Sequence, residues 1–402
     1  METRSVNNLD KLKPYPFERL RELLAGVHHT AGLSHINLSI GEPKHPTPEL
    51  IKKALCDNLD GLAIYPGTQG LPATRQAIAD WIKKRFGAQI NPETQVLPIL
   101  GSREALFSFA QVALDGCQPN THVVFPNPFY QIYEGAAFLG GAEPVFVNIK
   151  PETGLPDFSQ LDTNTLSKTK LLYVCSPNNP TGAVYTLNDW QRLFDMADAH
   201  NIIIGSDECY SEIYLDENQP PMGALEAAAL LGRTDFNNIL VFSSLSKRSN
   251  APGLRSGYVA GDAHLIKRFL RYRTYHGSAM STTVQAASIA AWNDETHVQE
   301  NRRLYREKFH AFKRILDGTL DLHIPQAGFY FWAKINGSDT ALVKTLFEQA
   351  HITALPGSFL SRPSNGKNPG DGHIRIALVA SLAECEEAAH RIAHILSKGT
   401  PL

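Results

Sequence analysis

A lysine that follows a buried run of residues is the first candidate for chemistry in this sequence. Lys247 comes shortly after the apolar, β-rich run Ile239–Ser244. A lysine at the end of a buried strand can be desolvated, which lowers its pKa and makes its amine nucleophilic. Ser244 and Ser246 before it and Arg255 after it could together hold a phosphate. The alternative is a basic surface loop, and the residues alone leave both interpretations open.

A carboxylate ends a second apolar run, Ile202–Asp207. Burying Asp207 at a strand end is costly unless it pairs with a cation or caps a helix. One interpretation is a carboxylate that faces a protonated ring nitrogen of a cofactor, with the Tyr210 phenol on the same face. The other is a helix N-cap, because residues 211–214 could follow as a short helix.

Two further strand ends carry polar residues. Asn179 follows the run Leu171–Ser176, where its amide can donate to a ligand oxygen or simply belong to a turn rich in Asn, Pro and Gly. Ser102 follows the run Val96–Leu100 and Gly101, at the expected start of a helix. The free backbone N–H groups of a helix start favour phosphate, although Ser102 can also be a plain capping residue.

These residues lie at the ends of apolar, β-rich runs that alternate with helical segments. The runs are Val96–Leu100, His122–Pro126, Pro144–Asn148, Leu171–Ser176, Ile202–Asp207, Ile239–Ser244 and Gly257–Gly261. Segments such as Arg103–Leu114 and Asn188–His200 show helical spacing between them. Runs without polar alternation predict strands covered on both faces, so we expect an α/β fold with a mostly parallel sheet. Ligands bind beyond the carboxyl ends of such strands, which predicts a site there.

The pattern changes after Ser281. The sequence predicts three helices here, at Thr282–Trp292, Val298–Leu316 and Thr340–Ala350. We interpret two further segments, Phe329–Lys334 and His373–Leu378, as alternating runs. This α+β pattern predicts a smaller domain, on which the irregular, proline-containing first 45 or so residues are expected to pack. We therefore predict a large cofactor-binding α/β domain at 46–285, and a small α+β domain made of 1–45 plus 286–402.

Composition excludes several classes of function. The 402 residues carry 38 Lys+Arg against 40 Asp+Glu, and this net charge of −2 argues against nucleic-acid binding by bulk electrostatics. No stretch approaches the roughly 20 apolar residues that a membrane helix needs, and no secretory signal is visible. The five cysteines form no C-x-x-C pair and no zinc-ligand spacing occurs. We therefore expect a cytoplasmic protein without a membrane partner or a metal site.

Six motifs, in this order along the chain, resemble the fold-type I pyridoxal-phosphate aminotransferases of class I/II. The strongest are Ser-Pro-Asn-Asn-Pro-Thr-Gly at 176–182, Ser-Asp-Glu-Cys-Tyr at 206–210 and Ser-Leu-Ser-Lys at 244–247, with Arg255 following. The segments 39–43, 65–75 and 373–378 extend the resemblance towards both termini. It covers nearly the whole chain and implies the PLP-dependent transferase fold, with pyridoxal 5′-phosphate as the cofactor.

The resemblance assigns roles around the ring of that cofactor. Lys247 matches the lysine that forms the Schiff base and then moves a proton between substrate and cofactor. Asp207 matches the partner of the pyridine nitrogen, which lets the ring act as an electron sink. Asn179 and Tyr210 match hydrogen-bond partners of the phenolic oxygen, and Tyr130 matches an aromatic residue that stacks on the ring.

It also assigns the phosphate, substrate and subunit contacts. The implied phosphate ligands are Ser102, Arg103, Ser244, Ser246 and Arg255. The implied substrate-binding residues are Gly41, Asn179, Arg375 and Arg103. Among them, Arg375 matches the arginine that grips the substrate α-carboxylate with a bidentate fork. Tyr65 matches a residue that reaches the phosphate from the neighbouring subunit, which implies a homodimer.

Closer detail resembles one group within that family, the bacterial succinyldiaminopimelate aminotransferases. The segments that carry this finer likeness are 15–18, 38–48, 127–136 and 246–257. It implies amino transfer between N-succinyl-LL-2,6-diaminopimelate and 2-oxoglutarate, in lysine and diaminopimelate biosynthesis. Both substrates carry a distal carboxylate, for which Arg103 is the candidate cation, unless it only forms a surface salt bridge. The alternatives are another class I/II aminotransferase (aspartate, aromatic or N-acetylornithine type) and a PLP-dependent lyase on the same fold.

Overall fold

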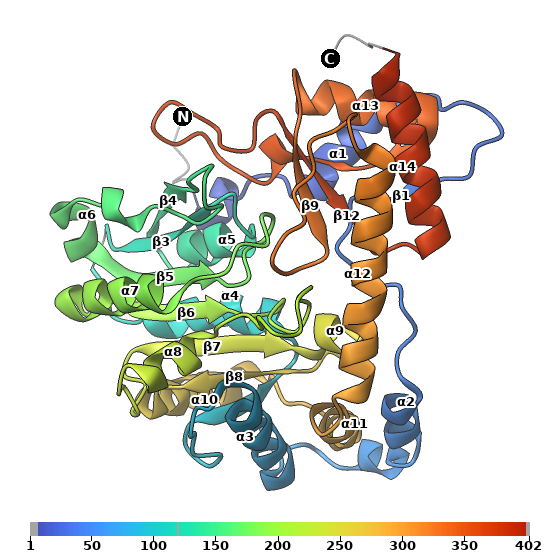
Figure 1. Ribbon diagram of the computed structural model, residues 1–402. Coiled ribbons are helices and arrows are strands. Elements are labelled where there is room, and N and C mark those ends of the chain that lie inside the picture. The colour runs from blue at the N-terminus through green and yellow to red at the C-terminus, as the bar shows by residue number, and fades with distance from the viewer. Residues whose placement is uncertain (1–6, 119, 399–402) are drawn as a thin grey trace, which may run out of the picture.

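A seven-stranded sheet forms the centre of the protein in the computed structural model, which describes residues 7–118 and 120–398 (Figure 1). Its strands are β2 (Val96–Ile99), β3 (His122–Asn127), β4 (Glu143–Asn148), β5 (Thr169–Cys175), β6 (Ile203–Asp207), β7 (Ile239–Ser244) and β8 (Gly257–Gly261). They lie in the order β2-β8-β7-β6-β5-β3-β4. All neighbours from β7 to β4 are parallel, whereas β8 runs antiparallel to both β7 and β2. The predicted α/β fold with a mostly parallel sheet is confirmed.

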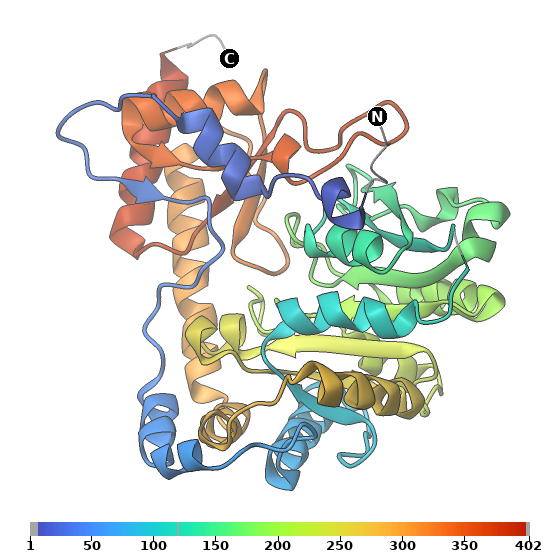
Figure 2. The same ribbon diagram turned by 180° about the vertical axis from the view of Figure 1, so that it is seen from behind.

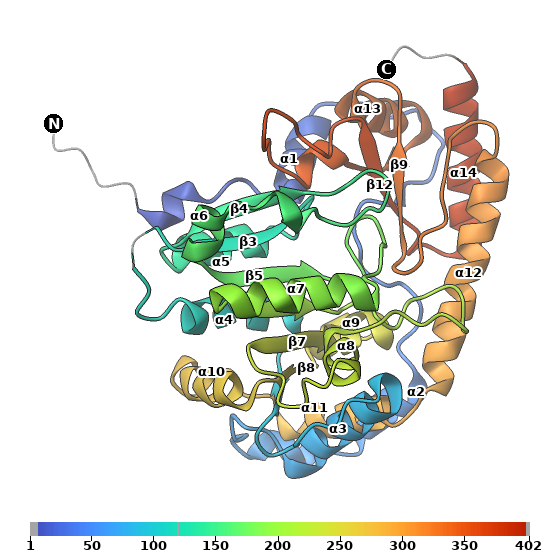
Figure 3. The same ribbon diagram turned by 60° about the vertical axis from the view of Figure 1, so that its left-hand side comes forward.

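Helices cover both faces of this sheet. Figure 2 looks onto the face that carries α4 (Ser102–Ala113), α5 (Ile132–Leu139) and α10 (Ala263–His276). The opposite face carries α3 (Pro72–Phe86), α7 (Leu187–His200), α8 (Ala224–Leu230) and α11 (Thr282–Trp292), of which Figure 3 brings α7 and α8 forward. In β5, Leu171 and Tyr173 join the core on the α4 side, and Leu172 and Val174 join the other. Strands with two apolar faces read as continuous apolar runs, which is why the sequence marks them clearly.

A small lobe combines segments from both ends of the chain. Its helices are α1 (Pro16–Leu24), α12 (Thr296–Leu316), α13 (Asp339–Ala350) and α14 (Leu382–Ser397), and its strands are β1 (Ile36–Asn37), β9 (Tyr330–Lys334), β10 (Ile352–Thr353), β11 (Leu355–Pro356) and β12 (His373–Ala377). β11, β12 and β9 form an antiparallel sheet, and β1 pairs in parallel with β10. Apolar side chains of these elements form a core of their own. Figure 1 shows α12 running from the large sheet up to this lobe.

Shorter elements complete the described chain. They are the helices α2 (Glu49–Cys56), α6 (Thr163–Lys168) and α9 (Leu245–Arg248) and the 3-10 turns η1 (Asn8–Lys11), η2 (Leu59–Ala63), η3 (Phe158–Gln160), η4 (Pro252–Leu254) and η5 (Gly357–Phe359). α11 packs on α2 and α3, and η1 lies against α5 of the large sheet. The boundary predicted at 285/286 therefore falls inside a helix that packs on the large sheet's side, and the domain limits stay a prediction. None of the described helices is long and apolar enough to cross a membrane.

Candidate active site

A cavity of about 500 Å³ opens at the carboxyl ends of the parallel strands. β2, β5, β6 and β7 all point the same way, so residues that follow them meet at one edge of the sheet. The predicted site residues that line the cavity are Gly41, Ser102, Arg103, Tyr130, Asn179, Asp207, Tyr210, Ser244, Ser246, Lys247, Arg255 and Arg375. Tyr65 does not line it and is fully exposed at the surface. The structure therefore brings together every predicted site residue except the one expected to act across a subunit interface.

Lys247 places its amine inside this cavity. Ser244 caps the short helix α9, because its Oγ accepts the backbone N–H of Ser246 at 3.0 Å. The helix thereby begins directly at the end of β7. The Lys247 Nζ donates at 2.5 Å to the carbonyl of Gly41, which also lines the cavity. Burial lowers the pKa of Lys247 to about 8. A much larger fraction of this amine is therefore neutral at physiological pH than for an exposed lysine.

Asp207 ends β6 as a buried carboxylate. Its Oδ2 accepts the Tyr133 hydroxyl at 2.7 Å, and its Oδ1 accepts the Cys209 backbone N–H at 3.3 Å. Burial raises the pKa of Asp207, and these two hydrogen bonds oppose that rise. Such a carboxylate gains most from a cationic partner in the cavity, as a protonated ring nitrogen would be. The helix N-cap that the sequence allowed is not formed, because a turn and not a helix follows β6.

Tyr133, on α5, is a residue of this site that the sequence reasoning missed. It lies in the first turn of α5, whereas Tyr130 lies in the loop before this helix, so no local spacing of the two tyrosines indicated it. Its ring stacks on Tyr173 of β5, with 4.7 Å between ring centroids. The Tyr173 hydroxyl donates elsewhere, to the Leu106 carbonyl. Tyr133 and Tyr173 are thus two equally buried tyrosines, of which only Tyr133 touches Asp207.

We expect Tyr133→Phe to weaken cofactor binding, because Asp207 then loses its hydroxyl donor while it stays buried. A hydrogen bond to a charged group contributes about 1–3 kcal/mol, which corresponds to a Kd about tenfold higher or more. Titrating the cofactor-free protein with pyridoxal phosphate and following absorbance measures this Kd. Tyr173→Phe is the matched control, since it removes a buried hydroxyl from the same stack. Equal effects of the two variants would contradict the role of Tyr133.

One corner of the cavity lies where α4 begins. Gly101 has a φ of +83°, and a Cβ there would lie 2.1 Å from the Arg255 Nη2, so only glycine lets this guanidinium approach the start of α4. Arg255 is held by the carbonyls of Pro252 and Leu100 at 2.9 and 3.0 Å. The N-cap residue of α4 is Gly101, which has no side chain to form a cap, so the first N–H groups of that helix are open to an anion. Ser244 and Ser246 hydroxyls line the same cavity.

Arg375 is a buried cation without a counter-ion in the described part of the chain. Its Nη1 donates to Asn179 Oδ1 at 3.2 Å, its Nη2 donates to the Ser39 carbonyl at 2.8 Å, and its Nε has no partner among the described residues. The other buried arginines of the described chain each pair with a glutamate, as Arg75–Glu93, Arg248–Glu295, Arg273–Glu104 and Arg302–Glu217. An isolated buried charge is costly, so Arg375 has the chemistry of a carboxylate receptor.

Aromatic hydroxyls complete the walls of the cavity. The hydroxyl groups of Tyr210 and Tyr330 lie 3.0 Å apart, and Tyr330 was not found from the sequence. Its ring lies 4.3 Å from the Arg375 guanidinium carbon. A Cβ at position 41 would lie 1.8 Å from the Tyr330 hydroxyl oxygen, which explains the glycine in the predicted motif. Across the cavity, Arg103 Nε donates to the Tyr130 hydroxyl.

These residues fit pyridoxal 5′-phosphate. The cradle at Gly101 and Arg255 suits a phosphate, the buried Asp207 suits a ring nitrogen, and the desolvated Lys247 amine suits an aldehyde. The assignment of each residue to its contact stays a prediction. Among the described residues, no cluster of three or more His, Cys, Asp or Glu side chains could hold a metal ion.

Known proteins resemble this chain over nearly its full length. The family described as aminotransferase class I and II matches residues 34–392. An LL-diaminopimelate aminotransferase of Dehalococcoides mccartyi is 32% identical, over 97% of this chain and 98% of that protein. A crystal structure of an aminotransferase from Neisseria meningitidis is 52% identical, with a TM-score of 0.94 over 97% of this chain and 99% of the other. A probable N-succinyldiaminopimelate aminotransferase from Thermus thermophilus is 25% identical, with a TM-score of 0.82 over 94% of this chain and 100% of the other.

The family match and the fold agree with each other. The matched region includes the whole seven-stranded sheet and most of the small lobe. It contains every predicted site residue, from Gly41 to Arg375. This protein therefore belongs to the pyridoxal-phosphate-dependent aminotransferases of class I and II.

Proposed function

We propose that the protein transfers an amino group between N-succinyl-LL-2,6-diaminopimelate and 2-oxoglutarate. The observation that carries this proposal is that the three arginines of the cavity, Arg103, Arg255 and Arg375, have no carboxylate partner among the described residues. With Arg255 assigned to the cofactor phosphate, Arg375 and Arg103 are left for the substrate. Both proposed substrates have an α-carboxylate and a distal carboxylate. A pair of unpaired guanidinium groups offers one receptor to each.

Each of several residues of the cavity has a separate role in the proposed reaction. The bound cofactor supplies a carbonyl that takes up the amino group and a ring that withdraws electrons from the substrate Cα. The Lys247 amine, with its lowered pKa, accepts and returns a proton at that carbon. Asp207 stabilises the positive charge on the ring nitrogen, and Arg375 fixes the orientation of the α-carboxylate.

LL-diaminopimelate is a second candidate for the amino donor. Relatives that match nearly the whole chain are described as LL-diaminopimelate aminotransferases. The cavity is also lined by Glu42, an exposed carboxylate that could pair with the distal ammonium group of that compound. N-succinylation converts this ammonium group into a neutral amide and adds a carboxylate. LL-diaminopimelate would therefore be bound by a negative charge at the far end of the cavity, and its N-succinyl derivative by a positive one.

The experiment that tests the proposal is a panel of single half-reactions with the loaded enzyme. Each amino donor is mixed with the enzyme, and the change in cofactor absorbance is followed. N-succinyl-LL-diaminopimelate should react with a higher kcat/KM than LL-diaminopimelate, N-acetylornithine, aspartate or phenylalanine. Formation of glutamate from 2-oxoglutarate in the second half distinguishes a transaminase from a lyase. A preference for any other donor would overturn the proposed substrate.

Arg103 is the proposed receptor for the distal carboxylate. We expect Arg103→Leu to raise the KM for 2-oxoglutarate about 10- to 100-fold, because a charge-assisted contact worth about 1.5–3 kcal/mol is lost. The KM for pyruvate, which has no distal carboxylate, should change little. Steady-state kinetics with the two oxo acids measures both values. An equal rise for both would show that Arg103 acts on the cofactor or the fold instead.

We also propose a cytoplasmic homodimer in which Tyr65 reaches the partner's phosphate site. Tyr65 is fully exposed, and Leu59, Leu62 and Ile64 beside it expose large apolar surfaces. Exposed apolar side chains close together in one segment support an interface. The near-neutral net charge gives no support for a nucleic-acid partner.

A further inference from the structure

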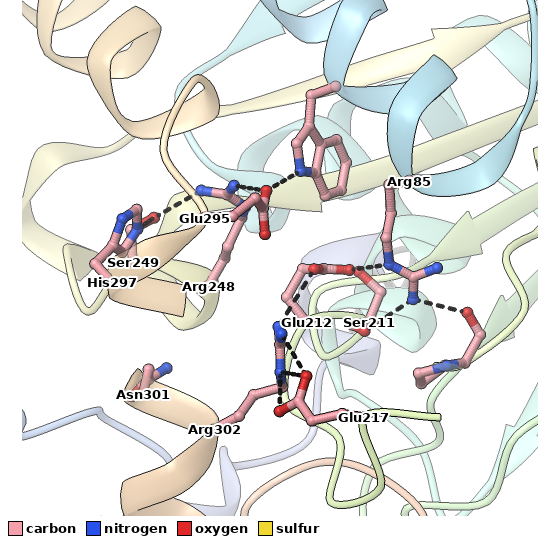
Figure 4. Close-up of polar contacts among 12 residues, drawn as sticks. Arg85, Ser211, Glu212, Glu217, Arg248, Ser249, Glu295, His297, Asn301 and Arg302 are labelled. Carbon is pink, nitrogen blue, oxygen red and sulfur yellow. Dashed lines mark hydrogen bonds and ion pairs between the residues drawn. The ribbon is translucent and has the colours of Figure 1, made fainter. Parts of the chain in front are cut away.

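The short helix α9, which carries Lys247, is hydrogen-bonded together with the next residue to the N-terminal end of α12. Arg248 is fully buried and donates from Nη2 to Glu295 Oε1 at 2.5 Å. The next residue, Ser249, has its hydroxyl 2.8 Å from the His297 Nε2. Figure 4 shows both pairs side by side, with Asn301 one helical turn further along α12. Successive residues after Lys247 are thus held by one helix.

Asn301 makes the contact with Lys247 itself. It is buried, and its Nδ2 donates to the Lys247 carbonyl at 3.3 Å. Its Oδ1 accepts from Asn250 Nδ2 at 3.1 Å and lies 2.8 Å from His45 Nδ1. One amide therefore joins the Lys247 turn to the segment that contains His45.

Lys308 fixes the direction of all these hydrogen bonds. Burial lowers the pKa of Lys308 to about 8, so at neutral pH it is mainly an ammonium group, which has only donors. Its Nζ lies 2.6 Å from His45 Nε2, and this ring nitrogen is therefore the acceptor. His45 is therefore neutral with its proton on Nδ1, and that N–H donates to Asn301. It follows that the Asn301 oxygen faces His45 and its NH₂ group faces Lys247. Burial and the nearby Lys308 lower the pKa of His45, which keeps the ring neutral.

The segment around His45 also touches Lys247 from the other side. Gly41 accepts the Lys247 amine, and Thr47 Oγ1 donates to the Asn250 carbonyl at 2.6 Å. Two direct hydrogen bonds therefore join residues 41–47 to residues 247–250. The Asn301 amide forms a third, indirect connection between His45 and the residues 247 and 250. The other charged or titratable groups near His45 and Lys308 are Lys44, Glu300, Glu384, Cys385 and Tyr305, whose ring lies against both His45 and the Lys308 amine.

We propose that Asn301, oriented by Lys308 through neutral His45, is a positioning residue that holds the Lys247 amine in place in the cavity. This inference rests on the role of Lys247 in the proposed function. Misplacing a reacting group by about 1 Å can cost about 10²-fold in rate. Protonation of His45 would place two cations face to face and remove the acceptor for Lys308, so the arrangement weakens in acid.

Two pairs of variants test this proposal. Asn301→Ala removes the amide, and Gln299→Ala, an exposed position on the same helix, is its control. His45→Leu removes the connection to Lys308, whereas His45→Gln keeps one donor and one acceptor but cannot be protonated. Asn301→Ala and His45→Leu should slow the half-reaction of the fully loaded enzyme about 10²-fold. Gln299→Ala and His45→Gln should stay close to wild type, and His45→Gln should lose less activity in acid.

A second readout does not depend on catalysis. The pH dependence of reductive methylation at Lys247, followed by mass spectrometry on the full-length protein without cofactor, gives the pKa of this amine. In Asn301→Ala and His45→Leu the midpoint should rise from about 8, because a looser turn admits water and relieves the desolvation. Unchanged midpoints and rates in both would overturn the proposal, as would equal behaviour of His45→Leu and His45→Gln. Should Asn301→Ala not fold, the His45 pair decides. Failure of the wild-type enzyme on the donor panel would reject the proposed substrate but leave the methylation result valid.

Discussion

Lys247→Ala should abolish amino transfer, with the half-reaction at least about 10⁴-fold slower than in the wild-type enzyme. In the proposed mechanism, the variant loses both the group that binds the cofactor covalently and the base that moves the proton at Cα. No other lysine lines the cavity in the described part of the chain, so no neighbour can replace it. Rapid mixing with glutamate, followed by absorbance, measures the rate.

A covalent readout separates this result from misfolding. Reduction with borohydride should fix the cofactor to residue 247 of the wild type and leave Lys247→Ala unmodified at that site, as peptide mass spectrometry detects. Lys267→Ala, on the exposed side of α10, is the control and should behave as wild type. Wild-type turnover in Lys247→Ala would remove the basis of the proposed mechanism.

The same lysine predicts a pH dependence for cofactor uptake. The neutral amine is the form that attacks the cofactor carbonyl, and burial lowers the pKa of Lys247 to about 8. The rate of uptake should therefore rise with pH up to about 8 and level off above it. An exposed lysine, with its ordinary pKa near 10.4, would give a rate still rising at pH 10.

Asp207→Asn should change activity and stability in opposite directions. Without the carboxylate, positive charge on the cofactor ring nitrogen loses the buried partner that we propose for it, and kcat should fall about 10³-fold. The cofactor-free variant, however, should melt at a higher temperature than the wild type at pH 7. A carboxylate buried without a cation destabilises the fold, and the neutral amide avoids that cost.

The sign of the stability effect follows from proton binding. Burial raises the pKa of Asp207 in the folded state, so the folded chain binds this proton more tightly than the unfolded chain does. The destabilisation is therefore present at neutral pH, declines as the pH falls below the raised pKa of the folded state, and is absent once the pH is below the ordinary carboxyl pKa near 4. Melting curves of the cofactor-free proteins at pH 7 and near pH 4 measure it. Asp195→Asn, at an exposed position of α7, is the control. A lower melting temperature for Asp207→Asn at pH 7 would contradict this account.

Much of the large sheet could be predicted because its strands are apolar on both faces. Each predicted run between residues 96 and 261 is a strand, with ends that differ by at most two residues. Thr282–Trp292 is a helix with the predicted bounds. Helices such as α3, α10 and α14 were not predicted, although α14 begins with a Ser381–Glu384 capping box that the sequence displays.

Only some residues of the candidate site could likewise be predicted from the sequence. Lys247, Asp207 and Ser102 could be proposed from strand ends, since these follow from local sequence. Tyr330 and Asn301 could not, because their partners lie far away along the chain and meet only in the folded protein. The orientation of Asn301 depends on a lysine and a histidine from two different segments. No local pattern contains that information.

The pairing of β1 with β10 has a consequence for biosynthesis of the chain. Ile36 lies beside Ile352, and the core of the small lobe needs α14, the last described helix. Edge strand β2 likewise pairs only with β8, which is made much later. During synthesis, β1 and β2 therefore leave the ribosome long before their partner strands exist, and their apolar side chains stay exposed to solvent. The central parallel strands can pair with one another before β1 and β2 find their partners. We expect nascent chains that end before residue 352 to depend on chaperones for solubility.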